Sequence, residues 1–92
     1  MGTDKLQASP IKALRLQLSL NQRDFSRLIG KSQAFLSDLE SASVKMPTDV
    51  VARLIELGAK GEEIRQEHEA VMERRLLELQ KDVIEKLKSG QR

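Results

Sequence analysis

Two short helix signals, separated by only a few residues, are the feature that most limits how this chain can fold. Asn21 and Ser32 are residue types that cap helix N-termini, and Gly30 is the type that ends helices. They predict one helix over about residues 22–29 and a second over about residues 33–40. This spacing is typical of a helix-turn-helix, in which the second helix enters the DNA major groove, and equally of an ordinary helical hairpin. The spacing alone leaves both interpretations open.

Two further helix signals flank this pair. Ser9 and Pro10 form an N-cap followed by proline at the first helical position, which predicts a helix over about residues 10–18. Pro47 opens another helix, which Gly58 ends, after a loop over residues 41–46 that we expect to be polar. The expected apolar faces of the four helices comprise Ile11, Leu14 and Leu18; Phe25, Leu28 and Ile29; Leu36 and Leu39 with Phe35 at the margin; and Val50, Val51, Leu54, Ile55 and Leu57.

The last third of the chain has a different composition. Residues 60–92 carry eight basic and eight acidic side chains without a proline, and they predict one helix over about residues 61–88 whose first turn, with Ile64, packs on the preceding domain. An apolar stripe runs along it, and its heptad spacing lasts for about two heptads before it fails at Lys86. Leu77 and Ile84 broaden the stripe beyond a narrow coiled-coil seam. Because such a face is not stable in water alone, we expect self-association, folding back on the domain, or docking of another protein. The stripe consists of Met72, Leu76, Leu79, Val83 and Leu87.

The composition argues against an enzyme. The chain has 92 residues, a formal net charge of +2, no cysteine and one histidine, so we expect one small domain, no metal site and no cofactor. That histidine, His68, lies between two glutamates, and we expect it on a solvated helix face. With two Phe and no Tyr or Trp, the chain lacks the aromatic platforms that stack single-stranded bases. No apolar run reaches membrane-spanning length, and we expect a cytoplasmic protein.

The stretch from Leu14 to Gly58 resembles the phage repressor and Cro family of helix-turn-helix proteins, also called the xenobiotic response element family. The resemblance implies an all-α fold: a compact four- to five-helix repressor-like bundle, here with an extended C-terminal helix. It also implies binding of double-stranded DNA, usually as a two-fold dimer. The residues that carry the resemblance are Leu14-Arg15, Leu20-Asn21-Gln22, Phe25-Ser26, Leu28-Ile29-Gly30, Ser32-Gln33-Ala34-Phe35-Leu36-Ser37, Leu39-Glu40, Pro47 and Leu54-Ile55-Glu56-Leu57-Gly58.

The resemblance assigns roles to particular positions. Arg15 and Glu40 fall where many members have a buried salt bridge, and Gln22 falls where the family's glutamine contacts a phosphate at a helix N-terminus. The base-contacting positions implied are Gln33, Ala34, Ser37 and Asp38. The phosphate-contacting positions are Gln22, Arg23, Lys31, Ser32 and Lys45.

Several residues depart from the family pattern. A carboxylate at Asp38 repels phosphate, so it must accept a hydrogen bond from cytosine, pair with a cation, or remain solvated. Ser26 replaces the usual alanine and adds a hydroxyl that needs a partner, and Ala42 replaces a common glycine. Lys31 replaces an apolar turn residue, and we expect Phe35 to pack on the preceding helix or to meet a thymine methyl group.

These observations predict an N-terminal arm over residues 1–8, a DNA-binding domain over 9–59, and a C-terminal helix over 60–92 for dimerisation or partner binding. The expected function is that of a dimeric, sequence-specific repressor that occludes a promoter at an inverted repeat, with half-site centres about 34 Å apart. Two alternatives remain. The chain could be an autoregulating antitoxin of a toxin–antitoxin pair, or an interaction adaptor that binds protein instead of DNA through its C-terminal helix.

Overall fold

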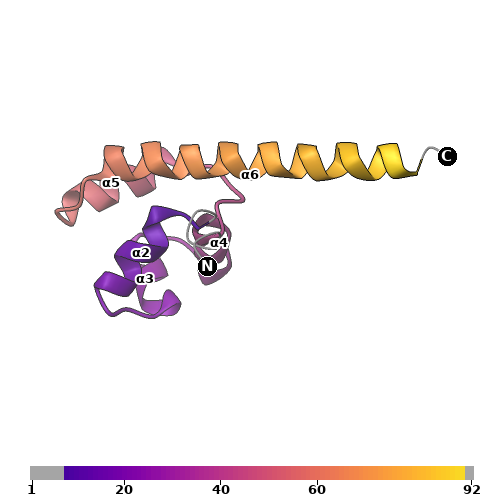
Figure 1. The fold of residues 1–92 in the computed structure, drawn as a ribbon. Coiled ribbons are helices and arrows are strands. Elements are labelled where there is room, and N and C mark those ends of the chain that lie inside the picture. The colour runs from indigo at the N-terminus through magenta and orange to yellow at the C-terminus, as the bar shows by residue number, and fades with distance from the viewer. Residues whose placement is uncertain (1–7, 91–92) are drawn as a thin grey trace.

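The computed structural model describes residues 8–90, and within that range all regular structure is helical (Figure 1). The predicted all-α class is therefore confirmed. Of the expected N-terminal arm, only Ala8 lies inside the described residues. The helices are α2 (Pro10–Gln17), α3 (Gln22–Leu28), α4 (Gln33–Glu40), α5 (Thr48–Glu56) and α6 (Gly61–Ser89).

Local sequence chemistry begins and ends these helices. Ser9, Asn21 and Ser32 cap α2, α3 and α4, and each side-chain oxygen accepts a hydrogen bond from a free backbone N–H of the first turn. Gly30 has φ +72° and Gly58 has φ +94°, the left-handed conformation that glycine adopts without strain. The capping bonds run to the nitrogens of Ile11 at 3.2 Å, Asp24 at 2.8 Å and Phe35 at 3.1 Å.

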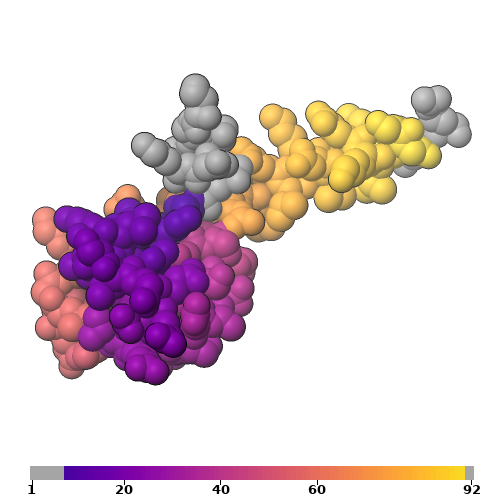
Figure 2. Space-filling view, turned by 90° about the horizontal axis from the view of Figure 1, so that it is seen from below, coloured from indigo at the N-terminus to yellow at the C-terminus, as the bar shows by residue number. Residues whose placement is uncertain are grey.

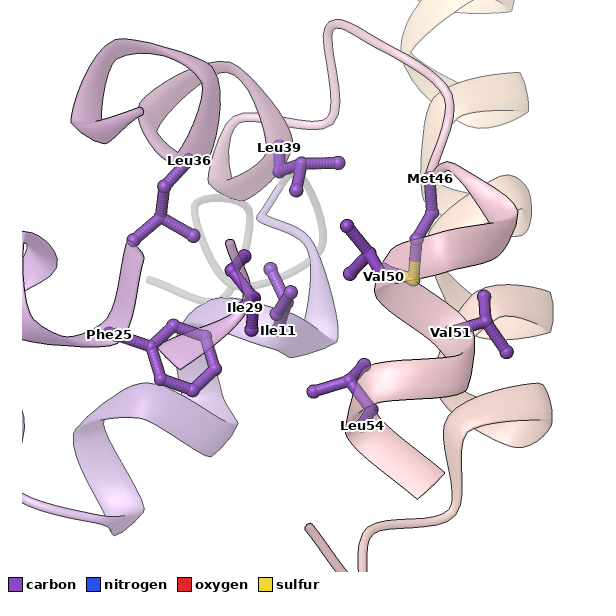
Figure 3. Close-up of a cluster of buried hydrophobic side chains, with 9 residues drawn as sticks. All are labelled: Ile11, Phe25, Ile29, Leu36, Leu39, Met46, Val50, Val51 and Leu54. Carbon is purple, nitrogen blue, oxygen red and sulfur yellow. The ribbon is translucent and has the colours of Figure 1, made fainter. Parts of the chain in front are cut away.

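The core lies where α2, α3, α4 and α5 meet (Figure 3). Each of its large apolar side chains contributes about 1.5–3 kcal/mol when fully buried, and Met46 joins them from the loop before α5. The buried cluster consists of Ile11, Phe25, Ile29, Leu36, Leu39, Met46, Val50, Val51 and Leu54.

The predicted apolar faces of α2, α3 and α5 were too wide. Leu18, Ile55 and Leu57 are 50%, 53% and 45% exposed, and Leu28 is 37% exposed. Leu18 and Leu57 are the C-cap residues of their helices, where the chain already turns away from the core.

The loop over residues 41–46 is less polar than predicted. Ala42 and Met46 are both buried, and Val44 packs against the core. Ala42 has φ +59°, so it adopts the left-handed conformation of the glycine that it replaces. The chain thus keeps this turn geometry without glycine, at a cost of about 1–2 kcal/mol in backbone strain.

Helix α6 has two halves in different surroundings. Its first half packs on α5 and α2, and Gly61 lies so close to α5 that an added Cβ would be 2.7 Å from the Val51 carbonyl oxygen. Ile64 packs against the core from the next turn. From Leu76 onward every residue of the helix is exposed, and this half extends away from the domain (Figures 1 and 2). None of the helices described over residues 8–90 is both long and apolar enough to cross a bilayer.

The prediction that His68 lies on a solvated face was wrong, because the side chain is fully buried. Its Nδ1 lies 2.6 Å from Ser9 Oγ, and its Nε2 lies 2.7 Å from the carbonyl oxygen of Val44. His68 follows Gly61 and Ile64 at helical spacing, and this period was the signal that could have placed it toward the domain. The ring therefore joins α6 to the start of α2 and to the loop after α4.

Candidate nucleic-acid interface

Helix α4 presents four exposed side chains on the face opposite its buried one. Leu36 and Leu39 are fully buried and fix the rotation of the helix about its axis. The exposed residues are the four predicted base-contacting positions, Gln33, Ala34, Ser37 and Asp38. Gln33 offers an amide that can bond adenine at two points, Ser37 a hydroxyl, and Ala34 a methyl group suited to thymine.

The turn between α3 and α4 holds the two helices together. The backbone N–H of Lys31 donates to the carbonyl of Ser26 at 2.9 Å, which closes the turn at Gly30. The hydroxyl of Ser26, itself buried, donates to the carbonyl of Arg23 at 2.8 Å. The departure from the family's alanine at this position therefore leaves no unsatisfied hydroxyl.

Arg15 and Glu40 form an ion pair that ties α2 to the C-terminal end of α4. Their side chains are 11% and 5% exposed, and Arg15 Nε and Nη2 donate to the two carboxylate oxygens at 2.5 and 3.2 Å. Arg15 Nη1 also donates to the carbonyl of Leu20 at 2.9 Å. This two-point geometry is the strong form of an arginine–carboxylate contact.

Gln22 belongs to the same network. Its Nε2 donates to Glu40 Oε1 at 3.0 Å, so its amide group orients the carboxylate instead of standing free. The N-terminus of α3, where Gln22 is the first residue, still presents free backbone N–H groups to an anion. The phosphate contact of Gln22 remains a prediction. The free backbone N–H groups of the helix N-terminus would be a second donor to the phosphate, besides the side-chain amide.

The other predicted phosphate contacts have different surroundings. Arg23, Ser32 and Lys45 are exposed. Lys31 is instead engaged within the domain, since its Nζ lies 2.9 Å from Asp49 Oδ2 and 5.6 Å from the centre of the Phe35 ring. The hydrogen bond from Lys31 lowers the pKa of the Asp49 carboxyl below its usual value, against an opposing effect of desolvation and with help from the charge of Lys31. Phe35 is half-buried and packs against the core.

Two cations near α4 were not among the predicted site residues. Lys12 of α2 and Arg75 of α6 line a surface hollow together with Ser37 of α4 and Ser41, the C-cap residue of that helix. Arg75 follows Val71 by four residues, which places it on the side of α6 that faces the domain. The helical period that runs from His68 through Val71 was the signal that could have placed Arg75 toward the domain. Among residues 8–90, no ion pair joins Asp38 to a cation.

The site consists of helix α4, whose exposed face is uncharged except for the carboxylate of Asp38, and of the cations that flank this helix. Bases are read by short polar and methyl groups, whereas phosphates are held by cations and helix N-termini. The arrangement is therefore suited to a duplex groove.

Comparison with known proteins supports this assignment. A search of curated proteins and a search of solved structures gave no match for this chain. A family model described as helix-turn-helix matches residues 11–57, from the start of α2 to the end of α5. The matched segment contains α4 and the two helices that pack on it, α2 and α3. The chain belongs to the Cro/C1-type helix-turn-helix family of DNA-binding transcriptional regulators.

Proposed function

We propose that this protein is a sequence-specific repressor that binds an inverted repeat in double-stranded DNA as a dimer and occludes a promoter. The observation that carries the proposal is the exposed face of α4. Gln33, Ala34 and Ser37 point outward from a helix whose other side is fully buried and whose end is fixed by the Glu40 ion pair. Groups held this rigidly discriminate among bases because a wrong base leaves a donor or acceptor unpaired.

The dimeric part of the proposal is supported by α6. A single helix-turn-helix domain contacts too few base pairs to select one site in a genome, and related modules overcome this limit by pairing. The outer half of α6 carries an uncovered apolar face, from Leu76 to Leu87, that a second copy would bury.

Selection of bound duplexes from a random DNA library at near-physiological salt tests the proposal. An enriched inverted repeat is the expected result, because each α4 would contact one half-site. An enriched single half-site, together with a monomeric mass, would contradict the dimer and leave the α6 face for another protein, as expected of an antitoxin. Recovery of no motif, or only salt-sensitive binding to every duplex, would contradict sequence-specific repression.

A further inference from the structure

The surface hollow beside the C-terminal end of α4 carries positive charge that the described part of the domain does not neutralise. Lys12 of α2 and Arg75 of α6 line it, and no salt bridge within the described part of the chain involves either side chain. The lining also includes the carboxylate of Glu40, but Arg15 and Gln22 already bind it. Because the carboxylate is compensated by its own arginine, the hollow keeps the charge of both cations.

The hollow lies on the flank of the helix that presents the predicted base contacts. Ser37, an exposed residue of α4, and Ser41, the C-cap residue, form its wall on the α4 side. An α-helix with its side chains is about 10–12 Å across, and the major groove of DNA is about 12 Å wide. A helix that fills the groove therefore has a phosphate backbone along each flank. With α4 in the groove, the hollow comes level with one of these backbones.

The packing of α6 holds Arg75 toward this flank. Arg75 follows the buried His68 by seven residues, so at about 100° per residue the two side chains leave the helix within about 20° of each other. The ring of His68 is in turn fixed by its contacts with Ser9 and Val44. Arg75 is half-buried, and its guanidinium group offers a fork of N–H donors that matches the oxygens of a phosphate. Such a pre-positioned side chain loses less conformational entropy on binding.

The small charge of the protein makes the position of each cation important. The formal net charge is only +2, so affinity for DNA depends on where the unpaired cations lie. Lys31, one of the predicted phosphate contacts, is paired with Asp49 within the domain. Lys12 and Arg75 are the cations that remain available in the hollow beside α4.

We propose that Arg75 and Lys12 together bind a phosphate group of the DNA strand that runs along this flank of α4. The inference rests on the DNA binding of the proposed function. It adds a backbone contact from α6, an element that lies outside the family match to residues 11–57. A phosphate contact carries no base information, so it strengthens binding to every duplex and fixes the orientation in which α4 enters the groove. The C-terminal helix is thus part of the DNA interface.

The salt dependence of DNA binding tests this contact, because each neutralised phosphate adds about 0.9 to the slope of log affinity against log salt concentration. The variants are Lys12→Gln, Arg75→Gln, their combination, and Arg75→Lys, which keeps the charge. The control is Lys60→Gln with Arg74→Gln, which removes the same charge at exposed positions, one at the N-cap of α6 and one next to Arg75. Fluorescence anisotropy at several salt concentrations measures the binding of each full-length variant to the selected and to a scrambled duplex.

The double variant of Lys12 and Arg75 is expected to lower the slope by about one on both duplexes, and each single glutamine variant by part of this. Arg75→Lys and the control are expected to keep the native slope. The ratio of the affinities for the two duplexes should stay native in every variant, because the contact reads no base.

Equal slopes for the double variant and its control, with DNA binding retained, would overturn the phosphate site and leave the proposed function intact. A native slope for Arg75→Gln beside a lowered slope for Lys12→Gln would overturn the part of α6 in the contact. Failure of the native chain to bind either duplex at any salt concentration would overturn the phosphate site and the proposed function together.

Discussion

Ser9 and His68 lie 59 positions apart in the sequence, and a buried contact of 2.6 Å between Ser9 Oγ and His68 Nδ1 joins them. The carbonyl of Val44 can only accept, so in the neutral ring Nε2 carries the proton and Nδ1 accepts from the Ser9 hydroxyl. The same hydroxyl oxygen accepts from the Ile11 N–H and caps α2. One serine thus begins the first helix of the DNA-binding domain and holds the last helix against it.

Replacement of His68 is expected to destabilise the whole domain. His68→Ala leaves a cavity and removes the partner of the Val44 carbonyl and of the Ser9 hydroxyl, with an expected loss of about 2–4 kcal/mol in the free energy of unfolding. Urea denaturation followed by circular dichroism measures it. The control is Gln66→Ala, an exposed position on the same helix, with an expected change within about 0.5 kcal/mol. Equal midpoints for the two variants would show that the His68 contacts do not stabilise the fold.

The effects of replacing Arg15 and of replacing Glu40 on the free energy of unfolding are expected to be strongly non-additive. Arg15→Leu leaves a carboxylate that is only 5% exposed without its cation, at a cost of about 3 kcal/mol. The double variant Arg15→Leu with Glu40→Leu removes both charges, and we expect it to be more stable than Arg15→Leu alone. The measurement is the same urea titration of Arg15→Leu, Glu40→Leu and the double variant. A double variant as unstable as the sum of the two single ones would contradict a coupled, buried pair.

Substitutions on the exposed face of α4 should separate DNA recognition from folding. Gln33→Ala with Ser37→Ala is expected to weaken binding to the selected duplex by about 1–3 kcal/mol for each lost base contact. The urea midpoint should stay unchanged, since both side chains are exposed. Fluorescence anisotropy with the selected and a scrambled duplex measures the difference, with Gln66→Ala as the matched glutamine control. Unchanged preference for the selected duplex would place the base contacts on another surface.

Charges introduced into the α6 stripe should separate the two copies. Leu76→Asp with Leu79→Asp is expected to give a monomer, because two carboxylates would have to be buried at the pairing surface. The monomer has a mass of 10.4 kDa, which light scattering after size exclusion distinguishes from a dimer. The control is Gln66→Asp with Ser89→Asp, which adds the same charge at exposed polar positions of α6. Equal masses for the two double variants would contradict the role of the stripe.

Because α6 lies so close to α5, replacing Gly61 by alanine should destabilise the protein far more than replacing Gly90. In Gly61→Ala the new Cβ would lie 2.7 Å from the Val51 carbonyl oxygen and 2.9 Å from Ile55 Cγ1, so α6 must shift, at about 1–3 kcal/mol. In Gly90→Ala the nearest atom is 3.4 Å away, an ordinary contact. The urea midpoints of the two variants give the comparison. A Gly61→Ala protein as stable as Gly90→Ala would show that α6 tolerates displacement.

The sequence predicted the features that depend on neighbouring residues. The caps at Ser9, Asn21 and Ser32 act on amides two or three residues ahead, so their residue types were sufficient. The exposed face of α4 followed from the period of its two buried leucines.

Features that depend on distant contacts could not be predicted in the same way. His68 stands between two exposed glutamates, and its burial depends on Ser9 and Val44, far from it in the chain. Leu18 and Ile55 fit a helical period, yet no element lies opposite them. Arg75 comes beside Ser37 only because α6 runs past the end of α4.

The attachment of α6 also sets where the protein can be shortened. The family match ends at residue 57, but a fragment ending at residue 59 would lack Ile64, His68 and Val71, which cover the core and satisfy Ser9. Such a fragment would expose apolar surface and leave the cap of α2 without its partner. A fragment ending after Arg75 keeps all these contacts and removes only the uncovered half of the helix. The smallest unit expected to fold independently therefore extends beyond the family match to Arg75, into a region that resembles a tail by composition alone.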